Sequence, residues 1–411
     1  MRIIWLMSFF SLGRTLSQDE SSAAGMHWVS TWTAASRDVG GTNLPPSPYG
    51  GSSVTVQFKN TTIRQTFRSS IGAGRIKFKL SNQFSKQPLP ITAASIALPK
   101  DGATGTADIQ SLSAKELTFA GAASVVLAPG EIIYSDAIEF NLRPLSTIAL
   151  SLYLRDGQSG TVLTGHPGSR TTTWLQTGNA VNATSVAEQS MIGWFFAAQI
   201  EGWVTGDHRG LVALGDSITD GLGSETNKNN RWTDVLAERL QQTGMTSLAV
   251  NNQGIGGNAV VQGGLGQTLL KRFQRDGVSQ SGAKYLLIFE GVNDLGYSGL
   301  DAASQEQMFE NLTRAYTDLV FQARAAGLIT IGATITPFGG SGYAHPLREA
   351  TRVRINDWIL KHSTYDHTVD FSAMVGNGSD KLLPEYSSDG LHLSVAGYKQ
   401  MGERFPLEIL Q

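Results

Sequence analysis

Residues of the types that cleave esters are spread over the second half of this 411-residue chain. Ser217 lies in GDSITDG, directly after the apolar run LVAL, and we expect Gly215 to leave the serine hydroxyl uncovered. Asp389 and His392 lie together in DGLH, a spacing that lets the carboxylate accept from Nδ1–H and leaves Nε2 facing outward. A serine hydroxyl is a weak nucleophile until a base takes its proton. We therefore predict an acyl-transfer site with Ser217 as nucleophile, His392 as base and Asp389 as the residue that orients the base.

Two further stretches supply hydrogen-bond donors suited to the oxyanion of such a reaction. In VNNQGIGGNAV the backbone N–H of Gly257 can face a reacting oxygen with no Cβ in the way, and Gly254 and Gly256 are alternatives. In FEGVNDLG the side-chain amide of Asn293 is a neutral donor, and the N–H of Ser217 itself is a third. Taken singly, each feature also fits an ordinary loop, turn or helix cap.

The elements that must position these residues follow from the hydrophobic pattern. From residue 207 to 411, apolar strand-like runs alternate with amphipathic helical runs, which indicates parallel strands joined by helical crossovers. Ser217, Gly257, Asn293 and Phe338 each follow a predicted strand. Ligands bind at the carboxyl ends of the strands in such sheets, so we expect these four residues to meet at one edge.

The loop FGGSGYAHPLRE also follows a predicted strand. It is either an ordinary glycine-rich loop or a border of the substrate cleft, with three candidate residues, Tyr343, His345 and Arg348.

The first half of the chain has a different pattern. Between residues 27 and 206, runs such as SVTVQF and GRIKFKLSNQF place apolar residues at every second position, with turn residues between the runs. No long helical period appears there. This pattern predicts an antiparallel β-sandwich or jelly-roll-like accessory domain over residues 27–206.

The N-terminal residues resemble a secretory signal. Arg2 is followed by an apolar run over residues 3–12 that is too short to span a bilayer, and Thr15 and Ser17 suit a cleavage site. We predict a signal peptide over residues 1–17, a polar linker over 18–26 and an extracellular location. The alternative is a start of translation at Met26.

Bulk composition excludes several classes of function. The formal net charge is −2 and the chain has no basic run, so we expect no nucleic-acid partner held by charge. The absence of cysteine excludes disulfides, thiolate catalysis and cysteine zinc sites. No stretch is apolar enough for an integral membrane segment, and nothing in the sequence indicates the oligomeric state. Four sequons are candidates for glycosylation, at Asn60, Asn182, Asn311 and Asn377.

Taken together, GDSITDG, GIGGN, GVND and DGLH resemble blocks I, II, III and V of the SGNH (GDSL) hydrolases over about residues 207–411. The resemblance implies a flavodoxin-like three-layer α/β/α fold. It also implies that Ser217 is the nucleophile, that Ser217, Gly257 and Asn293 form the oxyanion hole, and that Asp389 and His392 complete the triad. The first half resembles the β-domain that precedes this catalytic domain in many secreted microbial members. An α/β-hydrolase is excluded because GDSIT lacks the second glycine of Gly-X-Ser-X-Gly.

The predicted function is that of a secreted serine ester hydrolase that needs no metal or other cofactor. We expect a small-acyl or acetylated carbohydrate ester as substrate, because the sequence has neither an amphipathic lid nor a long apolar tract. Two alternatives remain open. One is a lipase or lysophospholipase with a lipid ester as substrate, and the other is a carbohydrate-binding or adhesion protein that acts through its β-domain.

Overall fold

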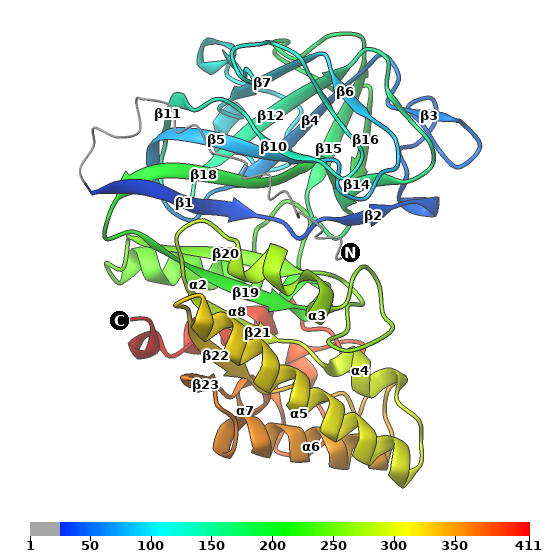
Figure 1. Ribbon diagram of the computed structural model, residues 1–411, viewed down its shortest axis with the longest axis vertical. Helices are drawn as coiled ribbons and strands as arrows, with labels where there is room; N and C mark the ends of the chain where they lie inside the picture. Colours follow the sequence, from blue (N-terminus) through cyan, green and yellow to red (C-terminus); the bar gives the residue numbers. More distant parts are fainter. Residues whose placement is uncertain (1–24) are drawn as a thin grey trace, which may run out of the picture.

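The computed structural model describes residues 25–411. The predicted signal peptide over residues 1–17 and most of the predicted linker over 18–26 lie outside these residues, and Met26 already belongs to the first strand. Two parts lie one above the other in Figure 1. We call residues 26–205 the β part and residues 209–411 the α/β part.

The β part consists of short strands that pair antiparallel. A five-stranded sheet has the order β1-β18-β5-β10, with β11 on the side of β5, and a six-stranded sheet has the order β16-β15-β4-β12-β7-β8. Smaller sheets pair β17-β14-β2, β13-β3 and β6-β9. The strands are β1 (Met26–Thr33), β2 (Arg37–Val39), β3 (Val56–Gln57), β4 (Thr61–Arg68), β5 (Ala73–Ser81), β6 (Leu89–Ile91), β7 (Ala93–Ala97), β8 (Lys115–Glu116), β9 (Val125–Leu127), β10 (Ile132–Tyr134), β11 (Ile138–Leu142), β12 (Thr147–Leu154), β13 (Gln158–Ser159), β14 (Leu163–His166), β15 (Thr172–Thr177), β16 (Gln189–Ile192), β17 (Trp194–Phe195) and β18 (Ala197–Thr205).

The period-two pattern of the sequence corresponds to burial on one face of these strands. In β5, Ile76, Phe78 and Leu80 are buried, and the residues between them are partly exposed. Their side chains pack with buried residues of β4 and β12, including Phe67 and Ile148, in one apolar core. The predicted antiparallel β-rich domain is therefore confirmed, and its finer sandwich or jelly-roll type stays a prediction.

The α/β part is built on a parallel sheet with the order β20-β19-β21-β22-β23. Its strands are β19 (Arg209–Gly215), β20 (Leu248–Gly254), β21 (Ala283–Phe289), β22 (Ile329–Ala333) and β23 (His367–Val369). Every pairing in this sheet is parallel. After β19 the chain first forms β20 on one side of β19. It then forms β21, β22 and β23 on the other side of β19. The order therefore switches beside β19, where sheets of this type bind their ligands.

Eight α-helices accompany this sheet in the described chain. They are α1 (Ser217–Asp220), α2 (Trp232–Gln242), α3 (Leu269–Arg272), α4 (Val292–Tyr297), α5 (Ala302–Ala325), α6 (Pro346–Lys361), α7 (Phe371–Val375) and α8 (Val395–Arg404). Helix α2 packs with α8 and α7 with α8, while α5 packs with α6. The predicted parallel sheet with helical crossovers is confirmed. The three-layer description and the domain limits at residues 206 and 207 stay predictions.

Two segments differ from the expected elements. The sequence TVDFSAM, expected as a strand, contributes only its first residues to β23, because the Asp370 side chain accepts from the N–H of Ala373 and starts α7. The expected helix QTLLKRFQRDGV begins as α3 and continues as a π-helical turn over Phe273–Val278.

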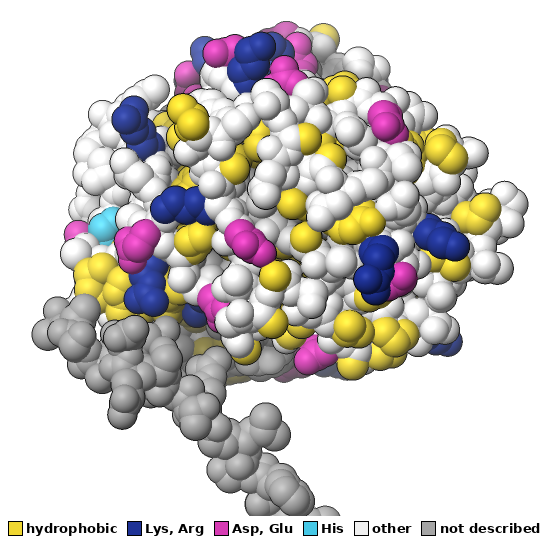
Figure 2. All heavy atoms as spheres, turned by 90° about the horizontal axis from the view of Figure 1, so that it is seen from above, with side chains coloured by type: hydrophobic (Ala, Val, Ile, Leu, Met, Phe, Trp, Pro, Cys, Tyr) yellow, Lys and Arg dark blue, Asp and Glu magenta, His cyan; other side chains and the backbone are white. Residues whose placement is uncertain are grey.

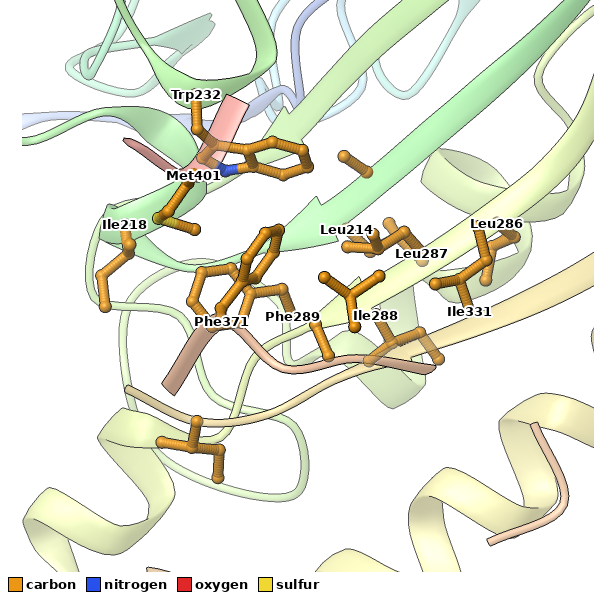
Figure 3. Close-up of a cluster of buried hydrophobic side chains, with 14 of the residues drawn as sticks. Leu214, Ile218, Trp232, Leu286, Leu287, Ile288, Phe289, Ile331, Phe371 and Met401 are labelled. Carbon is orange, nitrogen blue, oxygen red and sulfur yellow. The ribbon is translucent and has the colours of Figure 1, made fainter. Parts of the chain in front are cut away.

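The core of the α/β part anchors the turn that carries Ser217. Figure 3 shows Leu214 and Phe289 of the sheet among Trp232, Phe371 and Met401 of the helices, with Ile218 at the border of the same cluster. Ile218 is 1% exposed, although its neighbour Ser217 borders a cleft. Burial of such a side chain stabilises the fold by about 2 kcal/mol, so Ile218 resists any shift of the turn.

The β part covers the open edge of the parallel sheet. Strand β1 lies along β20 in Figure 1, and the N–H of Val250 in β20 donates to Ser70 Oγ at 3.1 Å. The hydroxyl of Thr33 donates to the carbonyl oxygen of Asn252 at 3.1 Å, and the Asn251 amide donates to the carbonyl oxygen of Ser30 at 3.1 Å. An uncovered edge strand invites pairing with other chains, so this contact satisfies polar groups that β20 would otherwise expose.

The outer surface of the β part has no single chemical character. Figure 2 shows the face that points away from the α/β part, where basic, acidic and hydrophobic side chains are scattered among polar ones. None of the described helices has the length and the apolar composition needed to cross a bilayer.

Candidate active site

The turn after β19 presents Ser217 at the carboxyl edge of the sheet. Strand β19 ends at Gly215, and α1 begins at Ser217. The Asp216 side chain caps this helix by accepting from the N–H of Ile218 at 2.9 Å. A Cβ at Gly215 would lie 2.7 Å from the carbonyl oxygen of Phe289 and would also meet the Thr219 side chain. Close packing under the turn therefore requires glycine at this position, and the expected role of Gly215 in leaving the hydroxyl uncovered stays a prediction.

A chain of two hydrogen bonds joins Ser217 to His392 and Asp389. The Ser217 hydroxyl lies 2.9 Å from His392 Nε2, and His392 Nδ1 lies 2.7 Å from Asp389 Oδ2. Gly390 between them has φ of +74°, and a Cβ there would clash with the backbone of Gly340. The two bonds fix the imidazole with Nε2 toward the serine, which is the arrangement that a general base needs.

Asp389 is held in its ionised form by the turn itself. Its Oδ1 accepts from the backbone N–H groups of Leu391 at 2.9 Å and of His392 at 2.8 Å. Partial burial raises the pKa of Asp389, but the bonds from the His392 side chain and from these two N–H groups outweigh it and leave the pKa below its usual value. The carboxylate therefore remains charged and able to stabilise an imidazolium at His392.

Two backbone N–H groups at the site have no acceptor within the described chain. They belong to Ser217 itself and to Gly257. The alternatives Gly254 and Gly256 are already occupied, because their N–H groups donate to Asn252 Oδ1 at 2.9 Å and to Asp220 Oδ2 at 3.0 Å. Of the three glycines considered from sequence, Gly257 thus has the one free donor.

The Asn293 amide is held on both of its polar atoms. Its Nδ2 donates to the carbonyl oxygen of Asn258 at 2.7 Å, which leaves one amide proton for another acceptor. Its Oδ1 accepts from the Tyr343 hydroxyl at 2.9 Å. Burial and hydrogen bonding with Tyr297 raise the pKa of Tyr343 above its usual value, so the phenol stays protonated. Asn293 therefore presents nitrogen, and not oxygen, to the cleft.

Of the three candidates from the glycine-rich loop, one lines the cleft and two do not. Tyr343 lines the cleft and holds Asn293. His345 instead caps α6, where its Nδ1 accepts from the N–H of Leu347 at 3.3 Å. Arg348 donates to the carbonyl oxygens of Tyr343 and Ser298 at 3.3 and 2.7 Å. Neither His345 nor Arg348 lines the cleft, although Arg348 fixes the backbone that carries Tyr343.

Sequence reasoning missed Arg272, which is buried beneath the site. Its guanidinium donates to the carbonyl oxygens of Gly215 at 2.9 Å and Gln253 at 2.7 Å, and to Asn258 Oδ1 at 2.8 Å. It also pairs with Glu290 at 3.1 Å. Arg272 thereby joins the ends of β19 and β20 to the loop that carries Gly257. In the sequence it stands in KRFQRD, where it resembles a solvated helix residue.

Asp216, Asp294 and Glu290 are three of the buried carboxyl groups near the site, and a fourth, Asp276, lies 3.5 Å from Arg272. Burial, which disfavours the charged form, raises the pKa of Asp216 to about 7, of Asp294 to about 6 and of Glu290 to about 8. Asp294 also accepts from the N–H groups of Val260 at 2.8 Å and Val261 at 3.0 Å, which supports the loop after Gly257.

Ser217 opens into a cleft of about 430 Å³ that both parts of the chain line. The α/β part contributes the residues described above together with Leu222, Leu265, Tyr297 and Leu391. The β part contributes Arg37, Asn43, His166, Pro167, Gly168 and Arg170. The hydrophobic pattern gave no indication that the β part borders the site, because these residues lie in short strands and loops.

One buried contact links the two parts at the cleft. His166 of β14 faces Asp220 Oδ1 with Nε2 at 2.8 Å and the carbonyl oxygen of Ala35 with Nδ1 at 2.8 Å. The other carboxylate oxygen of Asp220 accepts from the N–H of Gly256 at 3.0 Å. The β part is therefore connected through Asp220 to the residue that precedes Gly257.

The four predicted glycosylation sites lie away from this cleft. Asn60, Asn182 and Asn377 are exposed, and Asn311 is half-buried in α5. Their use stays a prediction.

The catalytic half of the chain has known relatives. Residues 213–400 match the GDSL-like lipase/acylhydrolase family, so this part of the chain is a domain of that family. Domain and site together define a carboxylic ester hydrolase. No curated protein is significantly similar to the chain.

Solved structures resemble about half of the chain. A protein assigned to the lipolytic G-D-S-L family from Desulfitobacterium hafniense has 24% identity, with 48% of this chain and 97% of that chain covered and a TM-score of 0.36. A GDSL-like lipase from Bacteroides thetaiotaomicron has 20% identity, coverage of 48% and 85%, and a TM-score of 0.35. An acetylxylan esterase from Geobacillus stearothermophilus has 20% identity, coverage of 49% and 93%, and a TM-score of 0.37. None of these likenesses bears on the substrate of this chain.

Proposed function

We propose that the chain hydrolyses carboxylic esters through an acyl-serine intermediate on Ser217. The observation that supports this most strongly is the line of hydrogen bonds from the Ser217 hydroxyl through His392 to Asp389, at 2.9 and 2.7 Å. Ser217 is only 5% exposed, yet it borders the cleft that an ester must enter.

In the first half of the reaction, His392 Nε2 takes the proton of Ser217 as Oγ attacks the ester carbonyl carbon. The carbonyl oxygen becomes an oxyanion, which accepts from the N–H groups of Ser217 and Gly257 and from the free amide proton of Asn293. When this intermediate collapses, the bond to the alcohol oxygen breaks, and His392 gives its proton to that oxygen. The alcohol leaves and the acyl group remains on Ser217.

In the second half, water takes the place of the alcohol. His392 removes a proton from water as its oxygen attacks the acyl carbon, and the same three donors stabilise the second oxyanion. Ser217 then leaves with the proton from His392, and the acid is released. Asp389 keeps its charge throughout and stabilises the imidazolium.

The preferred substrate is a small-acyl ester, with acetylated carbohydrates as the favoured natural class. The short, polar donors around Ser217 suit a small acyl group, and Tyr297 and Asn43 on the cleft walls suit the rings and hydroxyls of a sugar. The protein is proposed to act outside the cell, in line with the predicted signal peptide.

A lipid ester is the second candidate, and a specific observation favours it. Leu222, Leu265 and Tyr297 are 36%, 52% and 67% exposed, and all three line the cleft. Exposed apolar side chains around a catalytic group offer contact to an acyl chain, at about 0.8 kcal/mol for each buried CH₂.

An acyl-chain series separates the two candidates. We expect p-nitrophenyl acetate and butyrate to be hydrolysed with higher kcat/KM than the decanoate, because nothing in the described cleft forms a closed acyl tunnel. A kcat/KM that rises steadily with chain length would favour the lipid ester. Ser217→Ala is the control for each substrate. For the variant His392→Gln, the matched control is His362→Gln, because His362 is an exposed histidine at the end of α6.

A further inference from the structure

The wall of the cleft that the β part provides is basic. Arg37 in β2 and Arg170 in the loop after β14 both line the cleft that contains Ser217 and His392. Asp220 of α1, the carboxylate among the residues that line the cleft, is already engaged by His166 and by the N–H of Gly256. The free charge that the β part adds to the cleft is therefore positive.

Neither arginine is neutralised within the described chain. The Arg37 guanidinium donates to the carbonyl oxygen of its neighbour Asp38 at 3.1 Å, and the buried Nε of Arg170 has no hydrogen-bond partner among the described residues. Nearby arginines behave differently, since Arg231 pairs with Asp234 at 3.1 Å and Arg275 with Asp276 at 2.5 Å. A guanidinium that lines a cleft without a carboxylate partner keeps its charge available to an anionic ligand.

The backbone of Arg170 is held in a conformation that arginine rarely adopts. Its φ is +50°, in the left-handed region that costs energy for residues other than glycine. The carbonyl oxygen of Arg170 accepts from the N–H of Asn227 at 2.9 Å, and the N–H of Thr172 donates to Asn227 Oδ1 at 2.8 Å. The carbonyl oxygen of Ser169 accepts from Arg231. The α/β part thus fixes the loop on both sides of Arg170 and places this side chain on the cleft.

We propose that Arg170, together with Arg37, binds an anionic group of the ester substrate, either a carboxylate or a phosphate. A guanidinium offers paired N–H donors that match the two oxygens of either group. The same cleft is lined by the apolar residues Leu222 and Leu391, so the substrate would meet both charged and apolar side chains there. This inference rests on the proposed ester hydrolysis and adds to it a role for the β part in substrate selection.

Acetate esters that differ only in charge test the proposal. The probes are para-acetoxybenzoate, para-acetoxyphenyl phosphate and the neutral para-acetoxybenzamide, together with homologues that carry a longer spacer between ring and charge. Acetate release gives kcat/KM for each probe, and the ratio of an anionic probe to its neutral counterpart is the readout. The carboxylate and phosphate probes separate the two sources of negative charge.

We expect at least one anionic probe to have a ratio well above one in the wild type, and Arg170→Gln to lower that ratio by about tenfold. Arg170→Glu should lower it further, and added salt should lower it in the wild type alone. Arg143→Gln is the matched control, because Arg143 is an exposed arginine of the β part away from the cleft.

The proposal is overturned if the ratio stays the same in Arg170→Gln and Arg170→Glu, or if the wild type has no preference for either anion at any spacer length. Loss of hydrolysis on all probes, the neutral one included, in the wild type would contradict the proposed function itself. The two failures are therefore distinguishable. A folding defect is recognised by a loss of activity on every probe with no change of ratio.

Discussion

At the scale of single residues, each group proposed to act on the ester is held by another side chain or by the backbone. Asp389 orients His392, and Tyr343 orients the amide of Asn293. The first pair lies within one turn, so the sequence alone predicted it. The second pair is fifty residues apart in the chain, and no local pattern connects a glycine-rich loop to the amide that it orients.

Substitution of Tyr343 should weaken catalysis through Asn293. Asn293→Ala should lower kcat by about 10²- to 10³-fold, because one oxyanion donor is lost. Tyr343→Phe removes one hydrogen bond and should lower kcat by about 2- to 10-fold with little effect on KM. In the double variant, the second substitution should add almost nothing. Steady-state kinetics measures the effect of Tyr343→Phe on kcat in the wild type and in Asn293→Ala. An equal loss of kcat in these two proteins would show that Tyr343 acts independently of Asn293.

The buried carboxyl of Asp216 should make stability depend on pH. Its pKa is 3.8 in an unconstrained chain and about 7 in the folded protein, so the folded state holds the proton more tightly. The stability that this group contributes is complete below about pH 4 and is lost as pH rises to about 7. Asp216→Asn keeps the helix cap but cannot ionise.

We therefore expect Asp216→Asn to gain stability relative to the wild type as pH rises from 4 to 7, by up to a few kcal/mol, and the gap to stay constant above that range. Urea unfolding at intervals of pH measures the difference between the two proteins. A gap that is the same at every pH would mean that Asp216 does not hold its proton in the folded state.

At the scale of elements, the parallel sheet brings distant residues to one edge. The alternation of strand and helix predicted that Ser217, Gly257 and Asn293 follow consecutive strands, and all three line the same cleft. What the alternation does not contain is the support beneath this edge. Arg272 joins three loop and strand ends through hydrogen bonds to two carbonyl oxygens and one side chain, which only the folded chain brings together. Likewise, TVDFSAM has the composition of a strand, and the cap by Asp370 decides otherwise.

At the scale of the whole molecule, the β part contributes residues to the catalytic cleft and is not only linked to the α/β part by the chain. His166 of β14 lies 2.8 Å from the carbonyl oxygen of Ala35 and 2.8 Å from Asp220 Oδ1, so one side chain of the β part contacts both parts. Composition and pattern predicted a β-rich first half, but its contribution to one wall of the cleft depends on how the two parts pack. That packing combines scattered polar contacts of β20 with β1 and Ser70 and a small apolar cluster that includes Val29 and Ala249, and these leave no period in the sequence.

Loss of the His166 contact should destabilise the protein as a whole. His166 and Asp220 are 5% and 3% exposed, and leaving one partner of a buried hydrogen bond unsatisfied costs about 1 to 3 kcal/mol. His166→Gln should therefore lower the free energy of unfolding by an amount of this order. The matched control is His27→Gln, because His27 also lies in the β part and, among residues 25–411, its ring bonds to the carbonyl oxygen of His208 alone. Equal and small effects of both substitutions in urea unfolding would contradict a structural link at Asp220.

The central claim is that an acyl group is transferred to Ser217, and mass spectrometry of the enzyme quenched during turnover of p-nitrophenyl acetate tests it most directly. Where deacylation is too fast to leave label, a fluorophosphonate that mimics the tetrahedral intermediate replaces the ester. We predict one label per chain, located on the peptide that contains Ser217, and no label in Ser217→Ala. A label on another residue, or undiminished turnover by Ser217→Ala, would contradict the account.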